Sequence, residues 1–573
     1  MKGRGTVTVD VPVDYAVPQQ RDCARYKMHK YWAGKPWYVV AEYIRHFTRE
    51  GDIVLDPFCG GGVVGCEALI NRRKAVLNDV NPMAVFISKN TCRSPVDMEL
   101  FLAEFKKIEA RIKDKIMEMY RLREKCPICG EYLYAKHVVR GPSKKGAWIV
   151  EARCPKGHGR GFNIRRLLTE EEKADILRIE AAEIPFWYPD GELPDGREIM
   201  RLKKAGITHM HQLFTRRNLM ALSMLYHEIG HIGDEAVRDL MLTAFSNTLL
   251  HASKLKSEGL RPMSANSYYC MGDWIEENVW ERFENRILWR WGVFEGKKET
   301  NRLIGDYFKP VREFSGLEKE GTFMLSNLPA QHLSNLPSES VDYCFTDPPY
   351  GGSIQYGELT LLWRSWLKMG SDFIKDEIIV NRYQNKSEQD FGNMLKEAFG
   401  EVYRLLKPGH WLSVTFNNRD FGVWSALLNA CRTAGFEQVN IVPQKPLGNS
   451  FVQSWAKYSL KRDLILNFKK PVKASSRRQK NTPCLLEIKS LIIFTAKEYL
   501  AKHRRATLPE LFEAAMMRWI DVYYKQPDDG PLCLSGQGKQ CFDMAYVDRC
   551  LQQAPGFQRW EEDKNIIYSF VVE

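Results

Sequence analysis

The sequence lacks the features that mark membrane, secreted and low-complexity chains. Its 573 residues contain no apolar run near the ~18 residues that a membrane-spanning helix needs. The amino terminus, MKGRGTVTVDVPVDY, has no apolar signal core, and no internal repeat or low-complexity tract follows. Fourteen cysteines without a secretion signal predict a reducing compartment, the cytoplasm, where cysteines are thiols or metal ligands.

The composition is that of a folded chain with more than one domain, and the positive charge is concentrated in one segment. The hydrophobic fraction is 44% and the charged fraction 27%, and 573 residues exceed one ordinary domain. The net charge is +12, and the segment 121–166 holds twelve Lys and Arg against three acids. Such clustering is typical of a surface that binds nucleic-acid phosphates, although a solvated charged face would have the same composition.

Seven short apolar runs predict the strands of one Rossmann-like α/β sheet. They begin at Gly51, Lys74, Gly321, Val341, Gly409, Phe436 and Arg462. The first run ends in a glycine loop, and helical sequence follows both the first and the second run. Strand, glycine loop, helix and strand in this order open a doubly wound sheet.

A large insertion is predicted to interrupt this sheet. Between the second and third strands, residues 93–318 are predicted to form helices around the basic segment, so residues 26–92 and 319–470 form the two halves of the sheet domain. A polar linker, 471–482, precedes residues 483–573, which contain helical patterns and a terminal strand. These last residues predict a small C-terminal α/β module, for which a winged-helix fold is one interpretation.

The tetrapeptide Asp347-Pro348-Pro349-Tyr350 follows the fourth predicted strand. An exocyclic amino group on a nucleobase is a poor nucleophile because its lone pair is delocalised into the ring. Asp347 and the carbonyl of Pro348 could accept both N–H hydrogens and localise that pair. The prolines stiffen the turn, and Tyr350 offers a face for stacking a base that has left the duplex. A polyproline turn at a strand end, without a catalytic role, is the alternative.

The glycine loop after the first strand predicts a cofactor site. The sequence DPFCGGG runs from Asp56 to Gly62 and allows a ligand to approach backbone N–H groups closely. Asp79 ends the second strand, 23 positions after Asp56, where a carboxylate is placed to bind ribose hydroxyls. The loop departs from GxGxxG and no second half of a dinucleotide fold follows, so we do not expect NAD.

Two pairs of metal-ligating residues bracket the centre of the basic segment. Cys126 and Cys129 form a CxxC pair followed by glycine, and Cys154 and His158 form a CxxxH pair. Three thiolates and one imidazole fill the tetrahedral shell of Zn²⁺ and leave no open position, which predicts a structural zinc ribbon. The second pair departs from CxxC, so His137 remains an alternative fourth ligand.

Together these motifs resemble the S-adenosylmethionine-dependent DNA amino-methyltransferases, which methylate adenine N6 or cytosine N4. TDPPYG is similar to the catalytic turn of that family, and DPFCGGG to its DPFxGxG loop with Gly61 in place of serine. Asn78-Asp79 is similar to the end of its second strand, and Lys35-Pro36 to its lysine–proline element. With THMHQLFTRRNLMAL at 208–222, the chain more closely resembles adenine-specific methylases that carry a zinc ribbon, over residues 26–470.

The resemblance implies a seven-strand methyltransferase sheet, S-adenosylmethionine as cofactor and a structural Zn²⁺. By this similarity, the residues expected to hold the target amine are Asp347, Pro348, Pro349 and Tyr350. The residues expected to contact the cofactor are Lys35, Asp56, Phe58, Gly60, Gly62 and Asp79. The insertion between the two motifs is the expected target-recognition part.

The resemblance predicts a DNA methyltransferase that transfers the methyl group directly, in line, to a flipped base. DPPY rather than SPPY favours adenine N6. The alternatives are a cytosine-N4 DNA enzyme, a tRNA guanine-N2 enzyme with the same turn, and a zinc-ribbon nucleic-acid binder with a degenerate methyltransferase fold. The expected partners are DNA and, by the same similarity, a restriction or defence system; no membrane partner and no particular oligomeric state is predicted.

Overall fold

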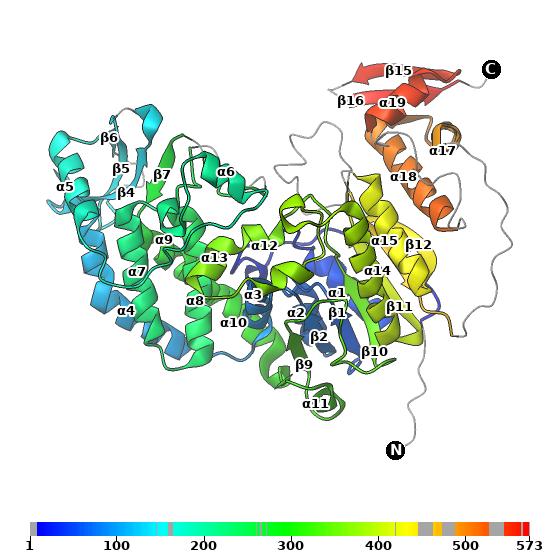
Figure 1. The fold of residues 1–573 in the computed structure, drawn as a ribbon, viewed down its shortest axis with the longest axis horizontal. Helices are drawn as coiled ribbons and strands as arrows, with labels where there is room; N and C mark the ends of the chain where they lie inside the picture. Colours follow the sequence, from blue (N-terminus) through cyan, green and yellow to red (C-terminus); the bar gives the residue numbers. More distant parts are fainter. Residues whose placement is uncertain are drawn as a thin grey trace.

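A central α/β domain carries a mostly helical insertion on one side and a small C-terminal module on the other (Figure 1). The computed structural model describes residues 9–144, 146–158, 164–258, 261–263, 266–270, 272–418, 420–444, 462–472, 488–525, 544–562 and 565–571. Among the helices within these ranges, none has the length and apolar character needed to cross a lipid bilayer.

The central sheet has eight strands in the order β12-β13-β11-β10-β1-β2-β9-β8. Their bounds are β1 Ile53–Asp56, β2 Lys74–Asn78, β8 Pro310–Val311, β9 Phe323–Ser326, β10 Val341–Thr346, β11 Leu406–Phe416, β12 Glu437–Gln444 and β13 Asp463–Lys469. Only β13 runs antiparallel to its two neighbours among these paired strands, and the other pairs are parallel. The sheet is therefore mixed, which confirms the α/β class.

The predicted count of seven strands is wrong by one short edge strand. The structure adds β8, which pairs with β9 at the end of the sheet and lies within the segment predicted to be wholly insertion. Pro310 and Val311 are two residues only, too few to form an alternating or continuous apolar pattern. The addition extends the sheet at the end far from the predicted catalytic turn.

Side chains of each central strand alternate between two helical layers because successive residues point to opposite faces. Val54 and Tyr343 pack in the core beneath α1 and α2, whereas Leu55 and Cys344 belong to the core on the opposite face, with α14 and α15. The bounds of these helices are α1 Trp37–Phe47, α2 Val63–Ile70, α14 Glu388–Leu405 and α15 Phe421–Ala434. Strands such as β10 are buried at every position for this reason.

The strand order brings the predicted site residues to one edge of the sheet. The carboxyl ends of β1, β2, β10 and β11 meet at this edge, and β13 begins there because it is antiparallel. From β1 the chain moves outward through β2 and β9, and it returns to the other side of β1 at β10. Open α/β sheets bind ligands at such a switch point, outside the carboxyl ends of the strands.

The insertion between β2 and β9 combines helices with a second, antiparallel sheet. The insertion begins after α3 Pro82–Cys92. Its helices are α4 Met98–Glu118, α5 Glu170–Ala181, α6 Ile199–Lys204, α7 Arg216–Gly230, α8 Glu235–Ala252, α9 Val279–Leu288, α10 Val293–Ile304 and α11 Phe314–Glu318. Its strands are β3 Arg121–Lys125, β4 Tyr132–Arg140, β5 Ile149–Arg153, β6 Ile164–Leu167 and β7 Trp274–Glu277. In this second sheet β4 pairs with β3, β5 and β7, so β7 ties the sheet to the helical part.

A buried charge cluster joins the sheet of the insertion to its helices. The carboxylate of Glu276 on β7 is buried and accepts hydrogen bonds from Arg217 Nε and Nη2 at 3.0 and 2.9 Å. Arg140 Nη1 donates to it at 2.9 Å and Thr215 Oγ1 at 2.6 Å. Burial alone would raise the pKa of Glu276, but Arg217 and Arg140 lower it to about 2. The cluster is therefore ionised at neutral pH and fastens β4 and β7 to α7.

Glu276→Gln should lower the free energy of unfolding by about 3–5 kcal/mol, because buried Arg217 loses its counter-charge and Arg140 keeps only Glu180. Chemical denaturation at pH 7 measures this loss. A carboxyl whose pKa is depressed in the fold stabilises above its unfolded pKa, so the deficit of the variant should shrink as the pH falls from 4.5 towards 2. Glu284→Gln breaks a half-exposed pair with Lys113 and should cost at most about 1 kcal/mol; equal losses would contradict the role of Glu276.

The C-terminal module contains the predicted helices and terminal strand, with two further strands. Its elements are α17 Ile488–His503, β14 Arg505–Thr507, α18 Leu508–Lys525, α19 Met544–Gln552, β15 Phe557–Glu562 and β16 Asn565–Phe570. The strands form an antiparallel sheet in the order β14-β16-β15. On α18, the Trp519 ring packs 4.6 Å from Phe421, and Tyr524 donates a hydrogen bond to the Phe436 carbonyl at 2.7 Å. The module thus docks on α15, and its winged-helix interpretation stays a prediction.

Candidate active site and metal centre

A cavity of about 780 Å³ lies at the carboxyl edge of the central sheet, within the size range of ligand sites. Its walls come from the glycine loop, the turn after β10, the arm that precedes α1, and helices α8 and α9 of the insertion. The predicted site residues that line it are Lys35, Asp56, Phe58, Gly60, Asp79, Asp347 and Pro349. Gly62, Pro348 and Tyr350 lie beside this lining, so the structure brings the two predicted motifs to one place.

Two positions of the loop, 60 and 62, require glycine for different structural reasons. Gly60 has φ +48°, and a Cβ there would lie 3.0 Å from Cε1 of Tyr31, which covers the loop. Gly62 has φ +80°, and a Cβ there would lie 2.9 Å from the Cα of Ser88 on α3. Gly60 therefore leaves room for the Tyr31 ring, whereas Gly62 permits the close packing of α2 on α3. For Gly62 this packing accounts for the glycine without the predicted cofactor contact.

Two aspartates, Asp56 and Asp79, hold the ends of β1 and β2. Asp56 accepts a hydrogen bond from Thr346 Oγ1 at 2.9 Å, which ties β1 to β10. Asp79 accepts from the backbone N–H groups of Gly60 and Asn81 at 3.0 and 2.9 Å. Burial raises the pKa of Asp56 to about 8 and that of Asp79 to about 6. Because a carboxylate offers about four acceptor sites, Asp79 keeps capacity for the hydroxyls of a ribose.

The turn after β10 forms a hydrogen-bonded triangle with Lys35. The ammonium Nζ of Lys35 donates to the Tyr350 hydroxyl at 2.7 Å and lies 3.1 Å from Asp347 Oδ2. The Tyr350 hydroxyl donates to Asp347 Oδ1 at 2.6 Å. Asp463, at the start of β13, places Oδ2 3.8 Å from the same ammonium. The structure thus puts Lys35 at the predicted catalytic turn, whereas the resemblance assigned it to the cofactor.

The charges of this triangle balance at neutral pH. Burial raises the pKa of Asp347 to about 6, and Lys35 limits the rise. Burial would lower the pKa of Lys35, but Asp347 and Asp463 outweigh it and raise the pKa. At pH 7 the site therefore holds a carboxylate against an ammonium group. An amino group that enters the site must share Asp347 with Lys35 or displace it.

The aromatic ring of Tyr350 is stacked on another ring of the sheet. Phe416, at the end of β11, lies parallel to it with ring centroids 5.1 Å apart and an interplanar angle of 4°. Tyr350 is 7% exposed. One of its two faces is thus occupied, and only the opposite face could receive a base. The predicted stacking role of Tyr350 is restricted to that face.

Sequence reasoning missed a second aromatic pair beside the turn. Tyr31 of the arm and Tyr356, the first residue of α12 (Tyr356–Leu359), stack with centroids 5.8 Å apart and 15° between their planes. Both line the cavity between the glycine loop and Asp347. Tyr356 lies six positions after Tyr350 in the sequence, but helical spacing gave no reason to place it in the site. Asp463 was missed too, because its position depends on the antiparallel course of β13.

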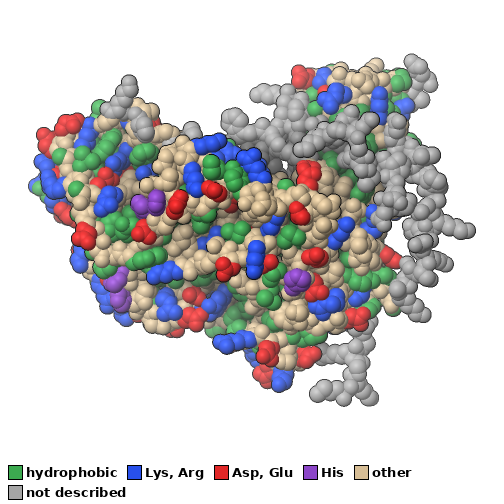
Figure 2. All heavy atoms as spheres, in the orientation of Figure 1, with side chains coloured by type: hydrophobic (Ala, Val, Ile, Leu, Met, Phe, Trp, Pro, Cys, Tyr) green, Lys and Arg blue, Asp and Glu red, His purple; other side chains and the backbone are tan. Residues whose placement is uncertain are grey.

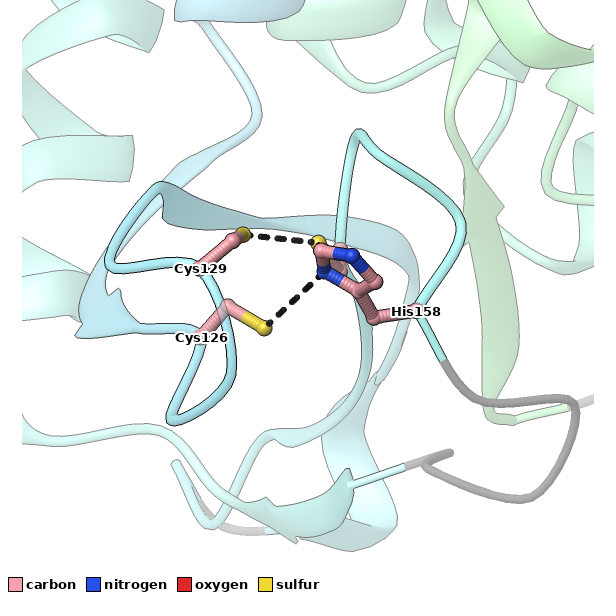
Figure 3. Close-up of side chains that lie close together, drawn as sticks. Cys126, Cys129 and His158 are labelled. Atoms are coloured by element: carbon pink, nitrogen blue, oxygen red, sulfur yellow. Dashed lines mark hydrogen bonds between the residues drawn. The ribbon is translucent and has the colours of Figure 1, made fainter.

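The predicted zinc ligands converge in the insertion. Cys126 and Cys129 lie in the turn between β3 and β4, and Cys154 and His158 follow β5 (Figure 3). Their ligand atoms all lie within 4.8 Å of one another, with Cys129 Sγ to Cys154 Sγ at 3.6 Å and Cys154 Sγ to His158 Nδ1 at 3.6 Å. Two sulfurs bound tetrahedrally at ~2.3 Å from zinc would be about 3.8 Å apart, so the donor set fits this ion.

The alternative ligand His137 does not belong to this cluster. Its ring lies on β4, where Nε2 is 3.4 Å from Oε2 of Glu151, a residue of the neighbouring strand β5. The four residues first proposed, Cys126, Cys129, Cys154 and His158, are the ones that the structure groups.

Most of the basic segment is neutralised by acids of the insertion itself. Figure 2 shows positive and negative side chains interspersed over this part of the molecule. Nine of the ten described cations between 121 and 166 form ion pairs: Arg121, Arg123, Lys136, Arg140, Lys144, Arg153, Lys156, Arg165 and Arg166. Many partners lie outside the segment, such as Asp175, Glu258 and Glu281. Lys145 and Arg160 lie outside the described residues. The excess charge seen in the sequence is therefore reduced in the fold.

Comparison with known proteins gives a family match over the stretch that contains the first half of this site. Residues 14–90 match the family model N6_N4_Mtase, described as DNA methylase. This match covers the arm, the glycine loop and Asp79, and it confirms the resemblance to DNA amino-methyltransferases over these residues. It does not reach the second sheet or its cysteines. A search of curated proteins gives no match.

Solved structures show only distant likenesses. A chain from Thermus thermophilus described as a DNA modification methylase is 21% identical, over 26% of this chain and 54% of that one, with a TM-score of 0.16. Its complex with S-adenosyl-L-methionine matches at 22% identity over 26% and 57% of the two chains, with the same TM-score. The matched part thus spans little more than half of the Thermus chains. A Bordetella parapertussis chain described as an exported protein also has a TM-score of 0.16, at 12% identity. At such scores no property of this chain follows from these likenesses.

Proposed function

We propose that this chain, with its DNA methylase segment at residues 14–90, is an S-adenosylmethionine-dependent DNA methyltransferase that acts on an exocyclic amino group. The observation that carries the proposal is the position of Asp347 in the same cavity as Gly60 and Asp79. A methyl donor held over the glycine loop would then face an amine held by the turn. The cavity, with both motifs in its walls, supports this pairing of cofactor and acceptor sites.

The proposed chemistry needs only acceptors and positioning from the protein. S-adenosylmethionine supplies an electrophilic methyl group on a sulfonium. The amino nitrogen forms a bond to the methyl carbon as the carbon–sulfur bond breaks, and the nitrogen then loses one proton. Asp347 would accept one N–H hydrogen, which localises the lone pair before attack, and the rigid prolines would hold it in place. The flipped base would lie against the face of Tyr350 opposite Phe416.

Adenine N6 is the base we propose, with cytosine N4 as the second candidate. The family model covers methylases named for both positions. The preference for adenine rests on the resemblance of DPPY to the adenine-specific group. Single-molecule sequencing of DNA from cells that express the chain reports base and motif together. Modified adenine in one sequence motif would support adenine N6 as the target. Modified cytosine would show that cytosine N4 is the target, and unmodified DNA would contradict the proposed DNA methylation.

We propose that each predicted part of the chain has a separate role in the reaction. Residues 26–92 would bind the cofactor and residues 319–470 would hold the amine. Residues 93–318 would recognise the target, with structural Zn²⁺ on Cys126, Cys129, Cys154 and His158. The four donor atoms within 4.8 Å of one another support the metal, whose role would be to fix the turn between β3 and β4 against the segment after β5.

The rate of methyl transfer should fall below about pH 6, because protonation of Asp347 removes an acceptor for the amine. Lys35→Met removes the cation that stabilises this carboxylate, so the pKa of Asp347 should rise and the acid limb of the rate profile should move to higher pH. Single-turnover rates between pH 5 and 9 would measure this. Lys319→Met, at an exposed position after α11, should leave the limb in place. If the acid limb of Lys35→Met lies at the same pH as that of the wild type, Asp347 is not the group whose protonation slows the reaction.

A further inference from the structure

The cavity at the carboxyl edge has one end lined by carboxyl groups and another lined by basic side chains. Asp56, Asp79 and Asp347 lie at the end formed by the glycine loop and the turn. The lining from the arm and the insertion instead contributes the basic side chains Lys30, His251 of α8, Arg261, and Arg286 of α9. This basic end is separate from the cysteine cluster and from the ion-paired basic segment.

The guanidinium groups at this end have no counter-charge. Within the described ranges, no acid forms an ion pair with Arg261 or Arg286, in contrast to the paired cations of the basic segment. Burial and the neighbouring cation Arg282 lower the pKa of Arg286 to about 10, so it stays charged at neutral pH. A cation that is partly desolvated beside another cation is unfavourable unless an anion joins it.

Lys30 fixes the segment that carries Arg261. Its ammonium Nζ donates to the carbonyls of Pro262 and Met263 at 3.3 and 2.9 Å. Burial lowers the pKa of Lys30 to about 8. The arm and the segment at Arg261 are therefore held together, and a second positive charge is added to the same wall of the cavity.

His251 supplies an unused hydrogen-bonding atom at this end. Its Nδ1 is buried and has no hydrogen-bond partner among the described residues. Burial and the nearby cations, of which Arg286 has the largest influence, keep the pKa of this imidazole well below its usual range. A neutral imidazole can donate one N–H to an anion, and leaving a buried polar atom unpaired costs about 1–3 kcal/mol. A bound oxyanion would satisfy both His251 and the guanidinium groups.

The position of this wall favours a nucleic-acid phosphate over the carboxylate of the cofactor. The Tyr31 ring lies against Gly60, and the Trp32 ring lies 5.7 Å from Tyr31 and 5.9 Å from Lys30 Nζ. Tyr31 thus contacts the glycine loop, whereas Trp32 lies next to Lys30 of the basic end. The cations also come from the insertion, the part proposed to face the target, and phosphate contacts are the ones that fix a duplex on its protein.

We propose that Arg261, Arg286 and His251, with Lys30 in support, form a subsite for one phosphodiester of the DNA strand that carries the target base. This inference rests on the proposed function, which it extends by naming the residues that hold the strand while the base enters the site. One phosphate would join the two guanidinium groups through charge-assisted hydrogen bonds.

Binding of a DNA duplex to Arg286→Gln and to Arg261→Gln tests this subsite. Each variant should bind about tenfold more weakly at low salt, as expected when a hydrogen bond to a charged group is removed. The slope of log K against log salt should decrease by about 0.9 in the double variant, because one phosphate is no longer neutralised by the protein. Arg312→Gln, an exposed arginine near β8, removes the same charge elsewhere and should leave both quantities unchanged. Arg261 is exposed, so its variant should fold normally.

The affinity for S-adenosylmethionine, measured by calorimetry on the same proteins, separates the outcomes. Unchanged cofactor affinity with weaker DNA binding supports the phosphate subsite. Unchanged DNA affinity and salt slope overturns it, and so does a selective loss of cofactor affinity, which would assign the cations to the cofactor carboxylate. Wild-type protein that binds DNA without methylating it would remove the proposed function, while the same variants would still decide the subsite.

Discussion

Asp347→Ala should lower the rate of methyl transfer by at least about 10²–10³-fold, the usual cost of removing one preorganised hydrogen-bonding group from the reacting centre. The carboxylate is the one acidic group of the turn after β10, and it lies 3.1 Å from the ammonium of Lys35. Without it, an incoming amine keeps its lone pair delocalised. Single-turnover transfer from labelled S-adenosylmethionine to DNA would measure the loss.

Asp347→Asn provides a graded comparison for this prediction. Its amide oxygen can still accept one N–H bond, so its rate should lie between those of the wild type and Asp347→Ala, and the limb near pH 6 should disappear. Asp372→Asn, exposed at the start of the 3-10 helix Asp372–Asp376, should behave as the wild type. Cofactor affinity should be retained in all three variants. A normal rate in Asp347→Ala would exclude Asp347 from the chemistry.

Cys126→Ser should abolish the binding of one zinc ion per chain and destabilise the insertion, because four ligands converge on one point and three cannot close the shell. Structural zinc contributes free energy directly to folding, about 10–16 kcal/mol in isolated zinc-finger peptides, so the effect on the second sheet should be large. Metal analysis of the purified chain and thermal unfolding would measure the two consequences.

Cys270→Ser is the matched control for the metal site. Cys270 is half-buried in the insertion, and its thiol donates to the Lys254 carbonyl at 3.7 Å, away from the four clustered residues. This variant should keep one zinc ion and unfold close to the wild type. Wild-type protein without zinc, or Cys126→Ser with normal zinc content and stability, would show that the cluster is not a metal site.

The local parts of this site could be predicted from sequence, because short-range chemistry determines them. The apolar run before Asp347 gave a strand and the two prolines gave a rigid turn, and the glycines after Asp56 gave a loop. Their meeting at one edge follows from the doubly wound order of the strands. The spacing of the two cysteine pairs was sufficient to predict which four side chains converge.

Contacts across long stretches of sequence could not be predicted. Lys35 bonds to Tyr350, 315 positions away, and no periodicity relates the two. The neutralisation of the basic segment could not be predicted because its acidic partners lie elsewhere in the sequence, as Glu281 does for Arg153, 128 positions away. Two-residue β8 was too short to be recognised. Arg286 is the opposite case: it has no ion pair with any residue that the structure describes, and nothing in the sequence distinguishes it from a paired arginine.

Transfer of a labelled methyl group from S-adenosylmethionine to DNA and to RNA, followed by nucleoside identification, tests the central claim most directly. We expect label in DNA, as N6-methyladenine, with transfer by the Asp347→Ala protein at least about 10²-fold slower. Label confined to RNA, or no transfer to either nucleic acid by a folded, zinc-loaded wild-type protein, would contradict the proposal that this chain is a DNA amino-methyltransferase.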